Sequence, residues 1–238
     1  MACTPDDADH MATIAVLGTG LLGAGMVENL LTKGETVRIW NRTREKLAPL
    51  VERGAVAAED PADCVRGAER VHLILSEDSA VDSVIEQLRP GLADGVPIID
   101  HTTNRPDKVR ARFDALRAAN VRYVPTPVFM APKHAQEGSG MMMMSGPKQD
   151  ADDLTAALET MTGKLWHVGD RPDLASVLKL AGNSVYFAIT GHPQVPVAAS
   201  FGSVFAPRSE PQACHPPHKK PCSPHSANCP SRATWWPV

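Results

Sequence analysis

The stretch "TIAVLGTGLLGAGMVENLLTKG", residues 13–34, changes its structural period at a cluster of glycines. Residues 13–18 are an apolar, β-branched run, which predicts a buried strand. From Leu21 to Lys33 the apolar residues recur at helical spacing, which predicts a helix. A glycine-rich G-x-G-x-x-G turn between a strand and a helix is the context of a dinucleotide-binding turn.

Each of the three glycines has its own steric reason in such a turn. Gly18 allows the tight turn, Gly20 lets the backbone approach a pyrophosphate, and Gly23 lets the helix pack closely on the strand. The pyrophosphate would lie on free backbone amides at the positive end of the helix. The remaining cofactor candidates in the turn are Thr19, Leu21 and Leu22. The alternative is a glycine-rich turn without a ligand, which the flanking strand and helix disfavour.

The alternation of strand and helix continues through residues 12–191. Further strands are predicted at 36–40, 70–75, 96–100, 121–126, 141–146 and 164–169, and further helices at Ala80–Leu88, Lys108–Ala119 and Asp150–Met161. The pattern predicts an α/β fold, a doubly wound Rossmann sheet that is mostly parallel, over residues 12–171. A helix follows at 172–191. The methionines at 141–144 indicate a buried strand and no metal site.

The end of the second predicted strand indicates which dinucleotide is bound. An NAD site usually has an acid about 20 residues beyond the glycines. Here Asn41, Arg42 and Thr43 follow the strand instead. An arginine between small polar residues suits a 2′-phosphate, so the sequence predicts NADP, with NAD less favoured. The alternative is that Arg42 is a solvated surface charge.

Four segments in order resemble the β-hydroxyacid dehydrogenases, which include 3-hydroxyisobutyrate dehydrogenase and the cofactor domain of 6-phosphogluconate dehydrogenase. The resemblance covers about residues 12–191. It rests on "GTGLLGAGMVENL" (18–30), "IIDHTTNRP" (98–106), "YVPTPVFMAP" (123–132) and "DLASVLKLAGN" (173–183). The resemblance implies an NADP-dependent oxidoreductase that transfers hydride between nicotinamide and a small hydroxy acid or a related carbonyl or imine.

The fourth segment carries the implied catalytic residues. Lys179 and Asn183 are four residues apart, so on a helix they project from one face. The resemblance implies that Lys179 is the general acid/base and that Asn183 orients the substrate. It also implies cofactor contacts from Leu75, Ser76 and Thr103 and a substrate contact from Thr102. Without the other motifs, a Lys–Asn pair on a helix would indicate only a solvated face.

The third segment departs from the family pattern. Relatives that oxidise small hydroxy acids usually have Ser-Gly-Gly where this chain has Phe129, Met130 and Ala131. A ring and a thioether donate no strong hydrogen bonds to a carboxylate, so we expect Phe129 and Met130 to favour a bulkier or less charged substrate. The related imine reductases have apolar pockets but usually lack the lysine, so Lys179 keeps this chain nearer the hydroxyacid group.

Composition excludes several other functions. A net charge of −3 disfavours nucleic acid as a partner, and no run approaches the length of a membrane span. Five cysteines without tight spacing disfavour a disulfide framework. Residues 1–11 are acidic without an apolar run, and we expect them to be disordered. The expected protein is cytoplasmic, binds a small-molecule substrate and holds no metal.

The last 47 residues, 192–238, have a different composition. They hold ten of the 21 prolines, three of the five cysteines and one of the 27 acids. Prolines at this density prevent a helix, so we expect disorder. A metal-binding extension is one interpretation, with Cys214, His215, His218, Cys222, His225 and Cys229 as ligand types. Their spacing lacks the close pairs of a zinc site, which favours the other interpretation, a change of reading frame shortly after Gly191.

A frame change would have consequences for function. The family's helical domain, which closes the active site and forms the homodimer interface, would be lost. Lys179 would then be open to water and would keep an ordinary pKa. The second hypothesis for this chain is therefore a truncated NADP-binding module without catalytic activity.

Overall fold

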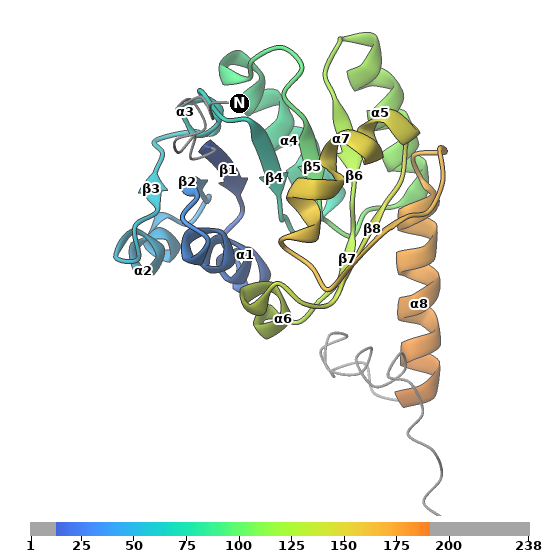
Figure 1. The fold of residues 1–238 in the computed structure, drawn as a ribbon. Helices are drawn as coiled ribbons and strands as arrows, with labels where there is room; N and C mark the ends of the chain where they lie inside the picture. Colours follow the sequence, from blue (N-terminus) through green and yellow to red (C-terminus); the bar gives the residue numbers. More distant parts are fainter. Residues whose placement is uncertain (1–12, 191–238) are drawn as a thin grey trace, which may run out of the picture. The chain divides into compact units, whose positions relative to one another are not determined.

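The computed structural model describes residues 13–190, and their central element is a six-stranded parallel sheet (Figure 1). Its strands are β1 (Thr13–Leu17), β2 (Thr36–Trp40), β3 (Val56–Ala57), β4 (Arg70–Leu73), β5 (Ile98–Asp100) and β6 (Tyr123–Pro125). The helices between them are α1 (Leu21–Thr32), α2 (Ala48–Val51), α3 (Pro61–Val65), α4 (Asp78–Leu88) and α5 (Pro106–Ala118), with short 3-10 turns at Arg44–Leu47 and Arg89–Gly91. The predicted strands and helices in this part of the chain are therefore present, with ends shifted by no more than a few residues.

The order of the strands in the sheet is β3-β2-β1-β4-β5-β6. The chain leaves β1 toward β2 and β3, and then returns to the other side of β1 to form β4. Strand β1 therefore pairs in parallel with β2 on one side and with β4 on the other. Thr13 lies opposite Thr36, and Ile14 lies opposite Arg70. This is the doubly wound Rossmann order, which confirms the predicted fold class. The direction of winding reverses between β1 and β4, where such sheets bind ligands at their carboxyl edge.

Alternate side chains of β1 enter two separate hydrophobic cores, one on each face of the sheet. Ile14 and Val16 pack with residues of α1 on one face. Ala15 and Leu17 pack with residues of α3 and α4 on the other. All four are completely buried. A strand buried on both faces reads as a continuous apolar run, which is why the sequence signal at β1 is strong.

The remaining strands form a second, three-stranded sheet that the sequence did not predict. It consists of β7 (Val128–Phe129), β8 (Met141–Met144) and β9 (Lys164–His167), with α6 (Pro132–Glu137) and α7 (Lys148–Glu159) between them. Strand β7 is antiparallel to β8, and β8 is parallel to β9. The last three methionines of β8 are at most 1 % exposed, which confirms the predicted buried strand.

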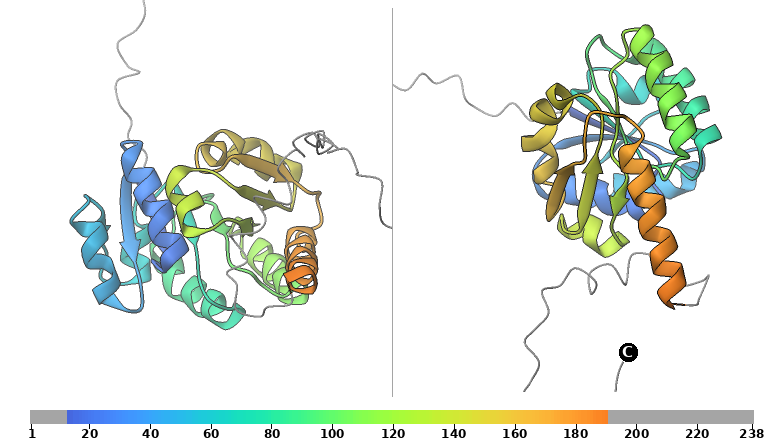
Figure 2. Two further views of the ribbon diagram at one scale, coloured as in Figure 1. Left: turned by 90° about the horizontal axis from the view of Figure 1, so that it is seen from below. Right: turned by 90° about the vertical axis from the view of Figure 1, so that its right-hand side faces the viewer.

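Helix α8 (Leu174–Thr190) is the last element and lies beside α5 (Figure 2). Its start is fixed by Asp173, whose carboxylate accepts hydrogen bonds from Arg110 at 2.7 Å and Arg171 at 2.8 Å. None of the helices in residues 13–190 has the length and apolarity needed to cross a bilayer. The predictions for residues 1–11 and 192–238, including the proposed metal ligands, lie outside the described residues.

A pair of histidines is buried in the sheet. His72 on β4 and His101 after β5 are stacked with 5.2 Å between ring centroids, and His72 Nδ1 lies 2.9 Å from His101 Nε2. Arg70 Nε donates to His72 Nε2 at 3.3 Å, so the proton of His72 is on Nδ1 and is donated to His101. His101 Nδ1 in turn donates to the carbonyl of Thr126 at 2.8 Å. Both rings are therefore neutral, and every ring nitrogen has a partner.

Acid will destabilise the fold through this pair. Burial lowers the pKa of His72 well below its ordinary value and that of His101 from 6.5 to about 4. The unfolded chain takes up protons near pH 6.5 and the folded chain does not, so stability present above pH 6.5 is lost as the pH falls toward 4. The loss for His101 is about 3 kcal/mol. Urea unfolding between pH 7.5 and 4.5 measures this loss of stability. The NMR signals of the imidazole rings report the titration of each histidine. A ring that titrates above pH 6 in the folded chain would contradict this account.

Candidate functional site

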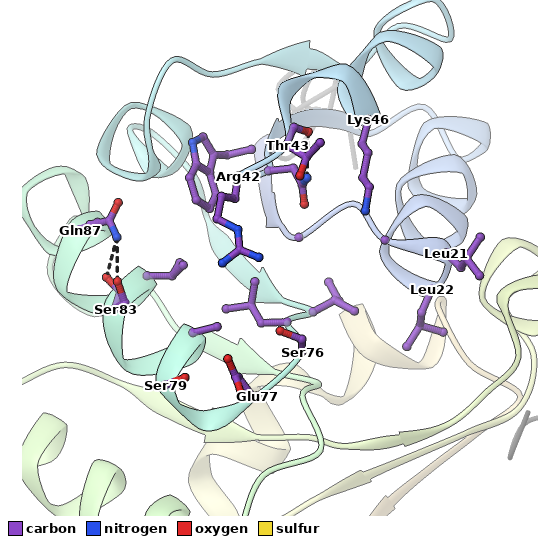
Figure 3. A pocket seen from close by; sticks show the side chains of 18 residues that line it. Leu21, Leu22, Arg42, Thr43, Lys46, Ser76, Glu77, Ser79, Ser83 and Gln87 are labelled. Atoms are coloured by element: carbon purple, nitrogen blue, oxygen red, sulfur yellow. Dashed lines mark hydrogen bonds between the residues drawn. The ribbon is translucent and has the colours of Figure 1, made fainter. Parts of the chain in front are cut away.

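A cavity of about 590 Å³ lies at the carboxyl ends of β1, β2 and β4, where the winding of the sheet reverses (Figure 3). This is the position at which doubly wound sheets bind their ligands. Nine of the twelve residues predicted to contact the cofactor line it: Gly18, Gly20, Leu21, Leu22, Asn41, Arg42, Thr43, Leu75 and Ser76. The structure thus brings the glycine turn, the end of β2 and the end of β4 into one pocket.

The three glycines of the turn have different surroundings. Gly18 has φ +103°, and a Cβ there would lie 2.2 Å from the carbonyl oxygen of Ile74. A Cβ on Gly23 would lie 2.0 Å from the carbonyl oxygen of Gly18. Nothing lies within 4 Å of a Cβ placed on Gly20, the residue that caps the N-terminus of α1. The fold itself therefore requires Gly18 and Gly23, and the space above Gly20 is open to a ligand.

Asn41 ties the end of β2 to the glycine turn. Its side-chain oxygen accepts a hydrogen bond from the backbone N–H of Thr19 at 3.1 Å. Its side-chain nitrogen donates to the carbonyl of Thr43 at 2.9 Å. The hydroxyl of Thr19 is buried and has no hydrogen-bond partner in residues 13–190. Asn41 thus links the glycine turn to the segment after β2, and these two loops border the pocket.

Two cations lie on the same side of the pocket. Arg42 and Lys46 both point into it (Figure 3), and neither forms an ion pair within residues 13–190. Lys46 is not among the residues predicted from the sequence to contact the cofactor. The signal that could have found it is its position in the short helical turn that starts at Arg44, directly after Arg42 and Thr43. The opposite wall carries the hydroxyls of Ser76, Ser79 and Ser83 and the acid Glu77.

Thr102 has a structural contact that the motif alone did not show. Its hydroxyl accepts a hydrogen bond from the backbone N–H of Leu75 at 3.0 Å, and the residue is only 3 % exposed. Its own N–H donates to the buried carboxylate of Asp100 at 2.9 Å. Thr102 therefore joins the end of β4 to the end of β5. Thr103 is exposed and does not line the pocket, so the contacts predicted for both threonines stay predictions.

The buried carboxylate of Asp100 fixes the loop after β5 through hydrogen bonds. Its second oxygen accepts hydrogen bonds from Tyr123 at 2.6 Å and from Asn104 at 2.7 Å. Burial raises the pKa of this carboxyl, and the hydrogen bonds from Tyr123 and Thr102 together with the charge of Arg112 oppose the rise. Asp100 belongs to the segment "IIDHTTNRP" (98–106), but no contact was predicted for it from the sequence.

Lys179 lies on α8 and is 8 % exposed. Its ammonium nitrogen is 4.1 Å from the centroid of the Phe129 ring, and it has no hydrogen bond or ion pair within residues 13–190. Burial lowers its pKa from 10.5 to about 8. The expectation that Lys179 would be open to water with an ordinary pKa is therefore wrong. The ring of Phe129 is one of the groups beside the amine.

The other predicted substrate contacts separate into two groups. Asn183 lies on α8 one turn beyond Lys179, and its side-chain oxygen is buried without a partner in residues 13–190. Phe129 lies against the same helix. Met130 is 7 % exposed and packs in the hydrophobic core, and its substrate contact stays a prediction.

The predicted residues thus form two sites, a pocket at the glycine turn and a Lys–Asn face on α8. The α8 residues do not line the pocket. Within residues 13–190 no three His, Cys, Asp or Glu side chains gather as metal ligands would.

The sheet order, the glycine turn and the pocket at the reversal point together define a Rossmann-type dinucleotide-binding domain. The chain belongs to the family of the NAD binding domain of 6-phosphogluconate dehydrogenase, whose model matches residues 13–169.

Similar proteins include dehydrogenases and reductases. Glyoxylate/succinic semialdehyde reductase 1 of Arabidopsis thaliana is 28 % identical over 159 residues, which are 66 % of this chain and 55 % of that protein. 3-Hydroxyisobutyrate dehydrogenase of Pseudomonas aeruginosa is 29 % identical over 176 residues, 73 % of this chain and 59 % of that protein. A solved imine reductase of Streptomyces aurantiacus has a TM-score of 0.69 at 28 % identity and covers 74 % of this chain and 62 % of its own. The chain therefore spans less than two thirds of the length of these relatives.

Proposed function

We propose that this chain binds NADP(H) at the glycine turn and transfers hydride between nicotinamide and a small hydroxy acid, or a related carbonyl or imine, with Lys179 as the general acid/base. The observation that carries the catalytic part is the state of Lys179, a buried amine without an ion-pair partner in the described residues and with a pKa lowered to about 8. Such an amine exchanges protons readily near neutral pH.

Three features of the pocket support the proposal of a dinucleotide with a 2′-phosphate. The open space at Gly20 leaves the free amides at the start of α1 accessible to a pyrophosphate. Arg42 and Lys46 supply positive charge at the end of β2, and Thr43 supplies a hydroxyl. No carboxylate follows β2 directly to bind two ribose hydroxyls or to repel a phosphate. These contacts support NADP over NAD.

The bound nicotinamide would supply or accept the hydride, and the chain's own residues handle the proton. In the direction of reduction the Lys179 ammonium donates a proton to the carbonyl oxygen of the substrate, and in oxidation the neutral amine accepts the hydroxyl proton. The unpartnered oxygen of Asn183 accepts a hydrogen bond from a substrate hydroxyl and so orients it.

The names of the relatives suggest the substrates to try. Semialdehydes, 3-hydroxyisobutyrate and imines form the first panel. Phe129 stands beside Lys179 and offers no hydrogen-bond donor to a carboxylate, which favours a bulkier or less charged substrate.

The second candidate function is a dinucleotide-binding module without catalysis. Its supporting observation is the exposed apolar surface of α8, where Val185 is 58 % and Ile189 is 72 % exposed. The relatives also extend beyond the matched part. This hypothesis shares the cofactor site and differs only in the predicted absence of turnover.

Replacing Arg42 with alanine tests the cofactor assignment. We expect the Kd for NADPH to rise about 10- to 100-fold, since a charge-assisted contact to the 2′-phosphate is lost, and the Kd for NADH to change little. Arg44→Ala is the matched control, because Arg44 is exposed and does not line the pocket. Fluorescence titration of both variants with both cofactors gives the answer. If Arg42→Ala raised the Kd for NADPH and the Kd for NADH equally, the proposed contact between Arg42 and the 2′-phosphate would be refuted.

A further inference from the structure

The ring of Phe129 packs against α8 at Gly182, which has no side chain to exclude it. A Cβ on Gly182 would lie 2.6 Å from Cζ of Phe129 and 3.4 Å from each Cε atom. Gly182 has no positive φ that would call for glycine, so the close approach of the ring is the steric reason for glycine here. Lys179 is three residues earlier on the same helix, which puts its amine beside the ring that Gly182 admits.

The charged groups near the start of α8 are already paired with one another. Arg110 of α5 and Arg171 both bond Asp173. No carboxylate lies close enough to Lys179 to form an ion pair within residues 13–190, and the lowered pKa of Lys179 has burial as its cause. The ring of Phe129 therefore occupies a position from which water or an acidic side chain could otherwise contact the Lys179 ammonium.

We propose that Phe129 is the positioning residue for Lys179, and that Gly182 provides the place on α8 where its ring comes to rest. The ring acts in two opposite ways. Its π face attracts the ammonium and so favours the charged form, whereas its bulk removes water and favours the neutral amine. Because the pKa of Lys179 is lowered to about 8, loss of water is the larger effect.

This arrangement gives Lys179 both protonation states at neutral pH. With a pKa of about 8, roughly a tenth of the molecules carry the neutral amine at pH 7, compared with less than a thousandth for an ordinary lysine. A group that both donates and accepts protons needs such a value. The inference deepens the proposed function, on which its catalytic meaning rests, but the geometry itself concerns only this chain.

The test measures the pKa of Lys179 directly in the full chain, without turnover. Lysines are dimethylated with ¹³C-formaldehyde, and the NMR signal missing from Lys179→Arg identifies Lys179. We expect it to titrate near pH 8 in the native chain. In Phe129→Ser the Lys179 pKa should rise by more than about one unit, and in Phe129→Leu, which keeps the apolar bulk, it should stay within about half a unit.

Gly182→Ala provides a second, independent variant, because its methyl group displaces the ring without changing Phe129. It should also raise the pKa of Lys179. NADPH binding, measured before methylation, reports that each variant is folded, since the pocket contains none of these residues. A native Lys179 that titrates near 10.5, or a Lys179 pKa unchanged in both Phe129→Ser and Gly182→Ala, overturns the proposal. An absence of turnover would refute the proposed catalysis and leave this result standing.

Discussion

Replacing Lys179 with alanine will reduce turnover by about 10²- to 10⁴-fold and leave the Kd for NADPH nearly unchanged. The size of the effect is that of a lost general acid/base. Affinity is preserved because Lys179 lies on α8 and does not line the cofactor pocket. The measurement is NADPH oxidation with the best substrate of the panel, together with a fluorescence titration of NADPH for the native chain and the variant.

Lys164→Ala is the control for this experiment, because Lys164 is an exposed lysine on an edge strand. Its turnover should equal that of the native chain. Unchanged turnover in Lys179→Ala would refute the acid/base assignment. Absence of turnover by the native chain over the whole panel would favour the second function, a cofactor-binding module.

Gly23→Ala will destabilise the domain by about 3 kcal/mol or more and abolish cofactor binding. The new methyl group would lie 2.0 Å from the carbonyl oxygen of Gly18. Gly18 belongs to the loop after β1 and Gly23 to the first turn of α1. Neither backbone segment can move to relieve the clash without separating the helix from β1. Overpacking of this kind has a large cost. Urea unfolding and NADPH titration measure the two effects.

Gly20→Ala is the matched comparison within the same turn. Gly20 has φ −67°, and nothing lies within 4 Å of the new methyl group, so the free energy of unfolding should change by less than about 0.5 kcal/mol. The Kd for NADPH should nevertheless rise at least about tenfold, because the methyl group occupies the space through which a pyrophosphate reaches the amides of α1. A Gly23→Ala chain as stable as Gly20→Ala would contradict the steric argument.

The sequence was most informative where the structure is determined locally. Strand β1, the turn at Gly18 and helix α1 are consecutive in the chain, and both structural periods and the glycines are visible within 22 residues. The same holds for Asn41 and Arg42, which follow a strand directly. The fold class and nine of the 18 residues that line the pocket could therefore be predicted from the sequence.

Contacts between distant segments could not be predicted in this way. The second sheet depends on β7, which has only two residues and gives no periodic signal. The hydrogen bond from the Leu75 N–H to Thr102 joins residues 27 positions apart, and the His72–His101 pair joins residues 29 apart. The contact of Lys179 with Phe129 likewise joins residues 50 positions apart, and the sequence predicted an exposed Lys179 only from the loss of the helical domain.

The most direct test of the account is a fluorescence titration of the 238-residue chain with NADPH and with NADH. The predicted result is saturable binding of both, with a Kd for NADPH at least about tenfold lower, since only NADPH carries the phosphate that Arg42 and Lys46 would contact. Tighter binding of NADH, or no binding of either cofactor, would contradict the assignment of this pocket to NADP.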